Sequence, residues 1–310
     1  MLVLLIASLL PAGLGCLFKA IPPCSCVPIA FKTTEITCKD ATDANELEKS
    51  LLNLQNQSVQ TLYIIDSSLM YLPSDVFKGL EVQKLHLINS TVQDLTESEV
   101  AFEGLGNSLE VLIIEECRIF NGFNWDEFRN LRNLVTLKTV KAGLLDIDSD
   151  IGDIAHLPLK ELHLTQDSIS YIDDRAFTKF KNLMILSLKR NHISVLKRSM
   201  FPNPAPKLTV INLSYNAIDT LPEDMFMNMP GLMSILLAGN NLITVDQKTF
   251  SSVWSQLNKI NLYDNPMRCD CRMKWILLMK SPKNTWAECV YPPNLAGSNF
   301  AYLNADDLKC

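Results

Sequence analysis

Residues 183–191 read LMILSLKRN, and the same pattern returns as LTVINLSYN at 208–216, LMSILLAGN at 232–240 and LNKINLYDN at 257–265. In each stretch apolar residues fill the first, fourth and sixth positions, and an asparagine fills the ninth. The fourth and sixth positions follow the two-residue period of a short strand with one buried face. The asparagine comes where such a strand must turn, and its side chain can bond to backbone groups that the turn leaves unpaired. These stretches predict a strand-and-turn unit that recurs along the chain.

Nine copies of this pattern run in register through the chain. The spacing between successive starts is 23 to 27 residues, within the range of leucine-rich repeats. The copies begin at Val59, Val82, Leu109, Leu134, Leu159, Leu183, Leu208, Leu232 and Leu257. A phenylalanine recurs 18 to 20 residues after most starts, at Phe77, Phe102, Phe128, Phe177, Phe201, Phe226 and Phe250. The shared register of both series indicates a repeat architecture.

The repeat pattern predicts the fold class. One repeat cannot bury its apolar face alone, so the copies must stack and the two ends must be capped. The predicted fold is α/β: a right-handed, arc-shaped leucine-rich-repeat solenoid with a concave parallel β-sheet and disulfide-bonded caps. The predicted divisions are a signal peptide at residues 1–15, an N-terminal cysteine cap at 16–58, the nine repeats at 59–265 and a C-terminal cysteine cap at 266–310.

Several copies depart from the pattern in the N-terminal half. Ser67 and Ser90 take the asparagine position of the first two copies, and Cys117 takes it in the third. The fourth copy has Ala142 there, carries Thr139 in place of a leucine and lacks the phenylalanine. We expect Cys117 to be buried and unreactive, because a catalytic thiol needs an activating base and few histidines are nearby.

The first fifteen residues predict a cleaved secretory signal. Residues 1–10 read MLVLLIASLL, and the small residues Gly13 and Gly15 follow where a signal peptidase needs them. The apolar run is shorter than the roughly 20 residues that a membrane-spanning helix requires. We expect a secreted, extracellular product with no membrane span in this chain.

The composition disfavours several classes of function. The chain has 28 Lys+Arg against 34 Asp+Glu, a net charge of −6, whereas nucleic-acid binding needs a basic surface. No metalloprotease, nucleophile-elbow, P-loop or dinucleotide motif is present in the sequence. His86 and His163 fall on predicted strands that lie roughly 14 Å apart at the usual strand spacing, too far to share a metal or a proton. We expect no catalytic residue, no cofactor and no metal site.

Cysteine-rich segments flank the repeats. Asn265-Pro266-x-x-Cys269-x-Cys271-x-x-x-Trp275, followed by Cys289 and Cys310, resembles the C-terminal cap of extracellular leucine-rich-repeat proteins. Cys16, Cys24, Cys26 and Cys38 resemble the N-terminal cap. The resemblance implies four disulfides: Cys16–Cys26, Cys24–Cys38, Cys269–Cys289 and Cys271–Cys310. Zinc sites at the two Cys-x-Cys pairs are disfavoured, because the secretory route is oxidising.

The side chains that alternate with the inward leucines should form an exposed concave face. Two apolar patches emerge on it, and contiguous apolar surface tends to mark a partner site. The N-terminal concave patch consists of Tyr63, Ile65, Ile88 and Ile113, and the C-terminal concave patch consists of Ile185, Val210, Leu236 and Tyr263. The alternative that such residues merely suit a sheet surface stays open.

Three asparagines match the acceptor sequence for N-glycosylation: Asn56, Asn89 and Asn212. Asn212 falls on the predicted concave sheet, where a glycan would obstruct a protein partner. Whether Asn212 carries a glycan therefore affects whether the concave face can bind a protein partner.

The whole chain also resembles a group of secreted arthropod leucine-rich-repeat proteins. The group, of spider type, is called Oplophorus-luciferin 2-monooxygenase non-catalytic subunit-like. The resemblance is strongest in KRSMFP at 197–202, LPEDMF at 221–226, VWSQL at 253–257 and NPMRCD at 265–270. In that group the repeat subunit accompanies a separate enzyme, so the resemblance implies partner binding without catalysis.

The sequence thus predicts a secreted extracellular protein, not an enzyme, that binds a protein partner through its concave sheet. Two alternatives stay open. One is a non-catalytic stabilising subunit of a secreted enzyme complex of the luciferase type. The other is the ectodomain of a Toll- or Slit-like receptor or adhesion protein.

Overall fold

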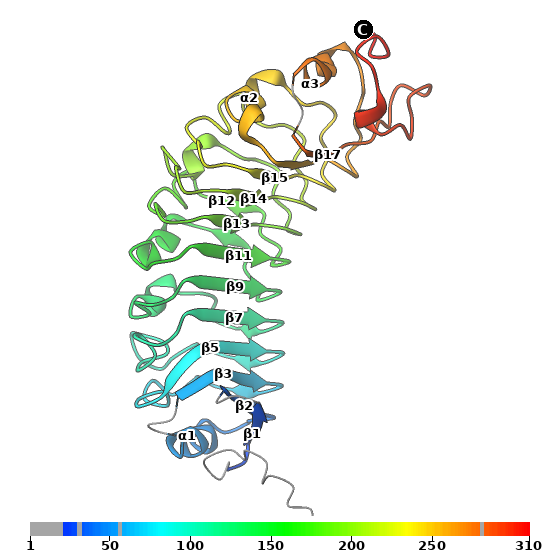
Figure 1. The fold of residues 1–310 in the computed structure, drawn as a ribbon. Helices are drawn as coiled ribbons and strands as arrows, with labels where there is room; N and C mark the ends of the chain where they lie inside the picture. The colour runs from blue at the N-terminus through cyan, green and yellow to red at the C-terminus, as the bar shows by residue number, and fades with distance from the viewer. Residues whose placement is uncertain (1–20, 30–32, 55–57, 280–281) are drawn as a thin grey trace, which may run out of the picture.

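The repeats stack into a bent solenoid whose strands form one long sheet (Figure 1). The computed structural model describes residues 21–29, 33–54, 58–279 and 282–310. Within these residues twelve strands lie in the order β1-β2-β3-β5-β7-β9-β11-β13-β14-β15-β16-β17. β1 and β2 pair antiparallel, and every later neighbour pairs parallel, which confirms the predicted parallel sheet.

The strands are longer at the N-terminal end of the sheet than at the C-terminal end. The first seven are β1 (Cys24–Ile29), β2 (Thr33–Lys39), β3 (Ser58–Ile65), β5 (Glu81–Ile88), β7 (Val111–Glu115), β9 (Thr136–Val140) and β11 (Glu161–Thr165). The last five are β13 (Ile185–Ser187), β14 (Val210–Asn212), β15 (Ser234–Leu236), β16 (Lys259–Asn261) and β17 (Asn284–Trp286).

Short elements lie outside the main sheet, in most repeats and in both caps. Two small parallel sheets are formed by β4 (Ser68–Leu69), β6 (Thr91–Val92) and β8 (Arg118–Ile119), and by β10 (Asp146–Ile147) and β12 (Tyr171–Ile172). The α-helices are α1 (Ala44–Leu52), α2 (Gln247–Ser251) and α3 (Lys274–Leu278). The 3₁₀ helices are η1 (Trp125–Phe128), η2 (Ser149–Ile154), η3 (Arg198–Met200), η4 (Trp254–Gln256), η5 (Cys271–Met273) and η6 (Phe300–Tyr302).

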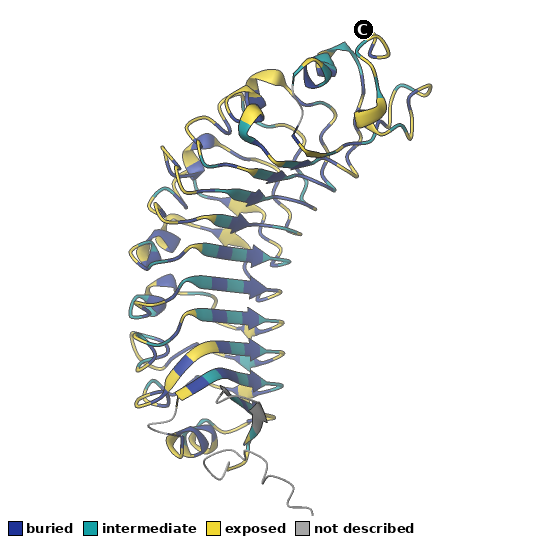
Figure 2. Cartoon of the chain, viewed as in Figure 1, coloured by how far each residue is buried: buried dark blue, intermediate teal, exposed yellow. Residues whose placement is uncertain are grey.

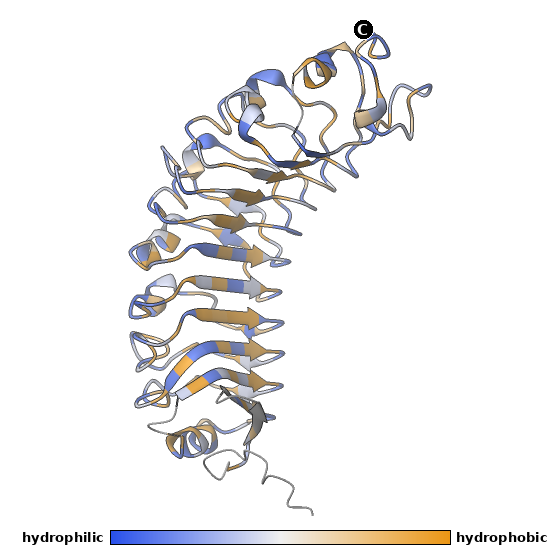
Figure 3. Ribbon diagram, viewed as in Figure 1, coloured by the Kyte–Doolittle hydropathy of each residue, from blue (hydrophilic) through white to orange (hydrophobic). Residues whose placement is uncertain are grey.

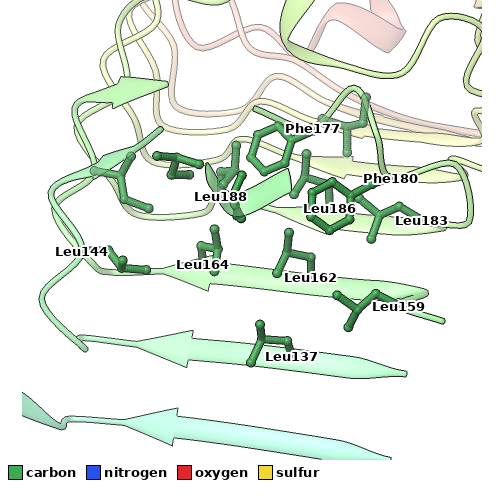
Figure 4. Packing of buried hydrophobic residues seen from close by; sticks show 14 of the residues in the cluster. Leu137, Leu144, Leu159, Leu162, Leu164, Phe177, Phe180, Leu183, Leu186 and Leu188 are labelled. Carbon is green, nitrogen blue, oxygen red and sulfur yellow. The ribbon is translucent and has the colours of Figure 1, made fainter. Parts of the chain in front are cut away.

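One continuous hydrophobic core runs the length of the solenoid. Buried and more exposed residues alternate along the strands, as a sheet with one covered face requires (Figure 2). Leu162 and Leu164 of β11 lie on the same side of the sheet as Phe177, together with Leu186 of the next repeat (Figure 4). All nine residues that begin the copies are buried, so the predicted register is confirmed.

The recurrent phenylalanines form a second column inside the core. All seven are among the largest fully buried side chains. Ring centroids lie 5.9 Å apart for Phe77 and Phe102 and 5.2 Å apart for Phe226 and Phe250. The column is interrupted at the fourth repeat, where Ile151 of η2 is buried instead.

The asparagines of the C-terminal repeats each join two neighbouring turns. The amide oxygen of Asn191 accepts hydrogen bonds from the N–H groups of Asp167 (3.0 Å) and Ile169 (3.2 Å). Its Nδ2 donates to the carbonyls of Leu164 (2.8 Å) and Leu188 (3.0 Å). Asn216, Asn240 and Asn265 bond in the same way, each to carbonyls of its own repeat and of the preceding one. The predicted turn role of asparagine is confirmed.

The serines that replace asparagine in the N-terminal half make a smaller link. The hydroxyl of Ser90 accepts a hydrogen bond from the N–H of Ser67 (3.1 Å) and donates to the carbonyl of Ile88 (2.8 Å). Ser67 repeats this arrangement, accepting from Ala41 and donating to Ile65. A hydroxyl can thus hold the turn with two bonds where the asparagine side chain uses four.

A buried carboxylic acid joins the fourth and fifth repeats, and the sequence pattern did not single it out. Asp167 takes the asparagine position of the fifth repeat and is 1% exposed. Its Oδ2 accepts from the hydroxyl of Thr139 at 2.6 Å, and its Oδ1 accepts from the N–H of Ala142. The hydroxyl of Thr165 donates to the Thr139 carbonyl (3.1 Å), which an asparagine amide would bond in the regular repeats. The threonine that replaces a leucine and the aspartate that replaces an asparagine therefore belong to one substituted turn.

Disulfides close both ends of the sheet. The structure joins Cys24 to Cys38, Cys269 to Cys289 and Cys271 to Cys310, which are three of the pairings that the resemblance implies. Cys26 is also disulfide-bonded. The implied pair Cys16–Cys26 and the predicted signal peptide involve residues outside the described ranges.

Each cap also covers the end of the core with apolar side chains. Asp43 caps the N-terminus of α1 by accepting a hydrogen bond from the N–H of Asn45. Leu47 and Leu51 of this helix are buried. At the other end the ring of Trp275 packs 4.7 Å from that of Trp254, and its indole N–H donates to the carbonyl of Val245 (3.0 Å). No helix among the described residues is long and apolar enough to cross a membrane.

Candidate functional site

The concave face carries the predicted site residues in the predicted columns. The strand pairings place Tyr63 opposite His86, His86 opposite Ile113, and Asn212 opposite Leu236. The central column runs from Thr37 of the N-terminal cap to Trp286 of the C-terminal cap. The sheet therefore offers one continuous surface for contact.

The N-terminal concave patch lies on β3, β5 and β7. Its four residues Tyr63, Ile65, Ile88 and Ile113 are half-buried, because the neighbouring strands cover their flanks. The Tyr63 ring packs 4.8 Å from the imidazole of His86. Burial raises the pKa of Tyr63 and lowers that of His86, where Lys84 and Lys138 add to the effect. The patch is a packed apolar surface with a neutral histidine, and β7 is apolar along most of its length (Figure 3).

Ion pairs surround this N-terminal patch. Lys39 pairs with Asp66 (3.3 Å), and Lys141 pairs with Glu116. His163 Nε2 also lies within hydrogen-bonding distance (3.3 Å) of Glu161 Oε2. The two lysine–carboxylate pairs satisfy one another's charge.

The C-terminal concave patch is more exposed and continues onto the cap. Ile185 and Val210 are direct partners across β13 and β14, Leu236 lies on β15, and Tyr263 is 54% exposed. Trp286 of β17 extends this surface, and the Lys259 ammonium lies 4.8 Å from the centroid of its ring. The repeat motif could not reveal Trp286, because β17 belongs to the cap and carries no L-x-x-L-x-L sequence.

Tyr215 forms a second aromatic platform at the rim of the same patch. The Arg190 guanidinium lies 5.4 Å and the Lys189 ammonium 5.6 Å from its ring centroid. The ring rests on Gly239, where an added Cβ would fall 2.4 Å from Tyr215 Cδ1 and where φ is +65°. Glycine is needed there both for the ring and for the backbone. Position alone could have placed Tyr215 at the rim, but not its cationic neighbours.

An open hollow of about 920 Å3 lies away from the concave sheet. Its lining is mostly charged or polar and includes Asp150, Asp173, Asp174, Arg175, Lys179 and Lys197. Lys197 Nζ donates to Asp174 Oδ1 at 2.7 Å, and burial raises the pKa of Asp150, with Asp148 and Asp153 adding to it. No group of three side chains suited to a metal ion occurs in the described part of the chain. The hollow therefore presents charges of both signs on a solvated surface, with Lys197 and Asp174 paired.

The predicted modification and thiol sites lie in different environments. Asn89 is exposed at the turn after β5, and its Nδ2 donates to Asp66 (2.6 Å). Asn212 is half-buried on the concave sheet, and its Oδ1 accepts from the N–H of Ser214. Asn56 lies outside the described residues. Cys117 is free and buried, and burial raises the pKa of its thiol, so the expected burial is confirmed.

Comparisons with known proteins agree with this geometry. A family model described as Leucine rich repeat matches residues 158–205 and 181–242. A solved structure of a TLR13–ssRNA13 complex superposes with a TM-score of 0.67 at 24% identity, covering 79% of this chain and 34% of that one. A chain of an octameric complex of Latrophilin 3, Unc5D and FLRT2 (LRR) gives a TM-score of 0.63 at 20% identity, covering 91% of this chain and 97% of that one.

This is a leucine-rich-repeat fold. Leucine-rich repeat-containing protein 3B of Danio rerio is 32% identical over 94 residues, which is 30% of this chain and 35% of that protein. Toll-like receptor 9 of Mus musculus is 26% identical over 205 residues, which is 64% of this chain and 19% of that protein. The chain spans 17% to 35% of the length of the curated relatives that it matches. None of these relatives carries the name of the luciferin-monooxygenase subunit group, so that narrower resemblance stays a prediction.

Proposed function

We propose that the protein is an extracellular, non-catalytic binding protein that holds a protein partner against its concave sheet. One observation carries the proposal: half-buried Leu236 and the exposed Tyr263 and Trp286 lie on or directly after the neighbouring strands β15, β16 and β17 of a continuous sheet surface. Exposed aromatic residues supply much of the energy of protein contacts when a partner removes them from water. The curved sheet behind them is held by a single core, so the surface is preorganised.

The disulfides support an extracellular location. Three disulfides close the caps of the described chain, and such bonds persist in oxidising compartments. The predicted signal at residues 1–15 agrees with that compartment. We propose a protein that is secreted.

A receptor ectodomain is the second candidate, and one observation favours it. Toll-like receptor 9, a much longer protein, matches 64% of this chain. In this case the concave sheet would bind in the same way, but on a surface tethered to further domains. Sequencing the transcript beyond the codon for Cys310 separates the two candidates.

Recovery of partners from the native extracellular fluid tests the binding role. The bait is the tagged protein, compared with Tyr263→Asp in the C-terminal patch and Ile113→Asp in the N-terminal patch. Met227→Asp is the control, because Met227 is 51% exposed and follows the buried Phe226 on the return side of its repeat. We expect at least one protein that wild type and the control retain and a concave variant loses. Recovery of the same proteins by all four baits would contradict a concave binding site.

A further inference from the structure

Three cations on the C-terminal half of the concave face have no acidic partner. Lys189, Arg190 and Lys259 make no ion pair with any residue that the structure describes. Each lies over an aromatic ring instead: Lys189 and Arg190 over Tyr215, and Lys259 over Trp286. A ring face holds a cation in place without neutralising it.

The charges of the two halves of the concave face differ in sign. In the first repeat the positions on this face are Thr61, Tyr63, Ile65 and Asp66. At the equivalent positions from β2 to β11, acidic side chains outnumber basic ones. The acids are Glu35, Asp40, Asp66, Glu115, Glu116 and Glu161, and the bases are Lys39, Lys84, Lys138 and Lys141. The same positions from β13 to β16 carry Lys189, Arg190 and Lys259 against Asp264 alone. An acidic protein with net charge −6 thus has a local basic region on its binding face.

We propose that this C-terminal cationic surface, formed by Lys189, Arg190 and Lys259 on Tyr215 and Trp286, binds an acidic segment of the partner protein. The inference rests on the proposed function and specifies the chemistry of its partner. Carboxylates of the segment would accept charge-assisted hydrogen bonds from the three cations. Its apolar side chains would cover Leu236 and Tyr263, which lie between the two platforms in the strand order, and Val210 on the strand that leads to Tyr215. Charge complementarity would bring the segment to this half and disfavour the acidic half.

A polypeptide fits this surface better than other polyanions do. One face of each ring, Tyr215 and Trp286, is covered by the protein's own cations, which leaves less of the rings free for the base stacking that single-stranded RNA requires. Three cations interspersed with apolar residues also match an acidic and apolar sequence more closely than the dense charge of a sulfated polysaccharide. These two polyanions are therefore competing outcomes of the test.

Binding to a defined acidic polypeptide tests the proposal. Immobilised glutamate–tyrosine copolymer is the probe, with heparin, a single-stranded oligouridine RNA and polylysine as comparisons. The variant Lys189→Glu/Lys259→Glu is matched by Lys84→Glu/Lys138→Glu, which changes the net charge equally on the N-terminal half of the same face. Circular dichroism and the denaturation midpoint check that both variants fold like wild type.

We expect the copolymer to bind, and its affinity to fall at least tenfold in Lys189→Glu/Lys259→Glu and less than twofold in the matched variant. The affinity should also decline with added salt, because the contact is electrostatic. Equal loss in both variants, no binding of the copolymer, or preferential binding of heparin or RNA would overturn the proposal.

The capture experiment separates this inference from the proposed function. A native partner that is lost with Lys189→Glu/Lys259→Glu supports both. If Ile113→Asp removes the partner while Lys189→Glu/Lys259→Glu retains it, concave binding stands and the acidic-segment inference is wrong. If no concave variant removes any protein, both are wrong.

Discussion

The N-terminal and C-terminal halves of this solenoid share one register but hold it in different ways. In the main sheet the strands up to β11 have at least five residues, and the turns from β3 to β11 are closed by Ser67, Ser90, Cys117 or the Thr139–Asp167 pair. From β13 to β16 the strands have three residues, and an asparagine closes each turn through bonds to two repeats. Where strand pairing is short, the side-chain amide takes over more of the backbone bonding.

The same division separates the two kinds of concave surface. The N-terminal half pairs some of its charges internally, as with Lys39 and Asp66, around half-buried isoleucines. The C-terminal half leaves its cations on aromatic rings and exposes Tyr263. This difference is consistent with the proposed contact through the C-terminal half.

The largest expected effect comes from breaking an asparagine turn. Asn240→Ala removes the donor to the carbonyls of Leu213 and Leu237 and the acceptor for the N–H of Ile218, inside a site that is 4% exposed. We expect the free energy of unfolding to fall by about 3 kcal/mol, because buried backbone groups lose their partners. Urea denaturation followed by circular dichroism measures the change.

Ser90→Ala is the matched substitution in the N-terminal half. It removes one acceptor and one donor, so we expect a loss of about 1.5 kcal/mol. Losses of equal size in the two variants would contradict the greater dependence of the C-terminal half on its turn side chains.

Asp167, at the boundary between the two halves, should make the free energy of unfolding depend on pH. Burial raises the pKa of Asp167, so the folded protein binds the proton more tightly than the unfolded chain does. The stabilising contribution of that proton is complete below the unfolded pKa of about 3.9 and is lost as the pH rises through the higher folded value. The amide of Asp167→Asn cannot titrate, so the variant does not lose stability in this way as the pH rises.

Denaturation of wild type and Asp167→Asn from pH 3.5 to pH 8 measures the effect. We expect the free energy of unfolding of Asp167→Asn, relative to wild type, to increase as the pH rises from about 4. A difference that stays constant with pH, or decreases, would show that the carboxyl is not held in its protonated form.

Cys117→Ser should have the smallest effect on stability. The thiol donates to the carbonyl of Glu115 (3.4 Å), the bond that the Ser67 and Ser90 hydroxyls make in their own repeats. We expect a change of about 0.5 kcal/mol, since a hydroxyl suits the same turn. A loss comparable with that of Asn240→Ala would mean that the three positions are not equivalent.

The native thiol of Cys117 should also resist alkylation. It is 5% exposed, and its raised pKa leaves little thiolate to react. Iodoacetamide labelling followed by mass spectrometry should modify it only in denaturant. Rapid labelling of the folded protein would contradict the buried environment.

The sequence predicted the repeats, the strand register and the columns of the concave face, because each follows from a fixed period in one chain. It did not predict the structural role of Asp167. An aspartate at a turn position is common, and only the structure shows its contact with Thr139. Trp286 was missed because the cap strand that carries it has no repeat motif. The cation–aromatic contacts at Tyr215 depend on side-chain directions, which a column of residues does not specify. The structure places the members of each predicted patch on or directly after neighbouring strands, but the roles of the patches in binding remain proposals.

The state of Asn212 in the native protein tests most directly whether the concave face is the binding surface. Asn212 lies between Ser187 and Leu236 in the central column of that face, so a glycan there would cover the C-terminal concave patch. Peptide mapping by mass spectrometry of the protein from its natural source gives the occupancy, with the exposed Asn89 as the internal comparison. We expect an unmodified Asn212, whereas a fully glycosylated Asn212 would contradict binding through this surface.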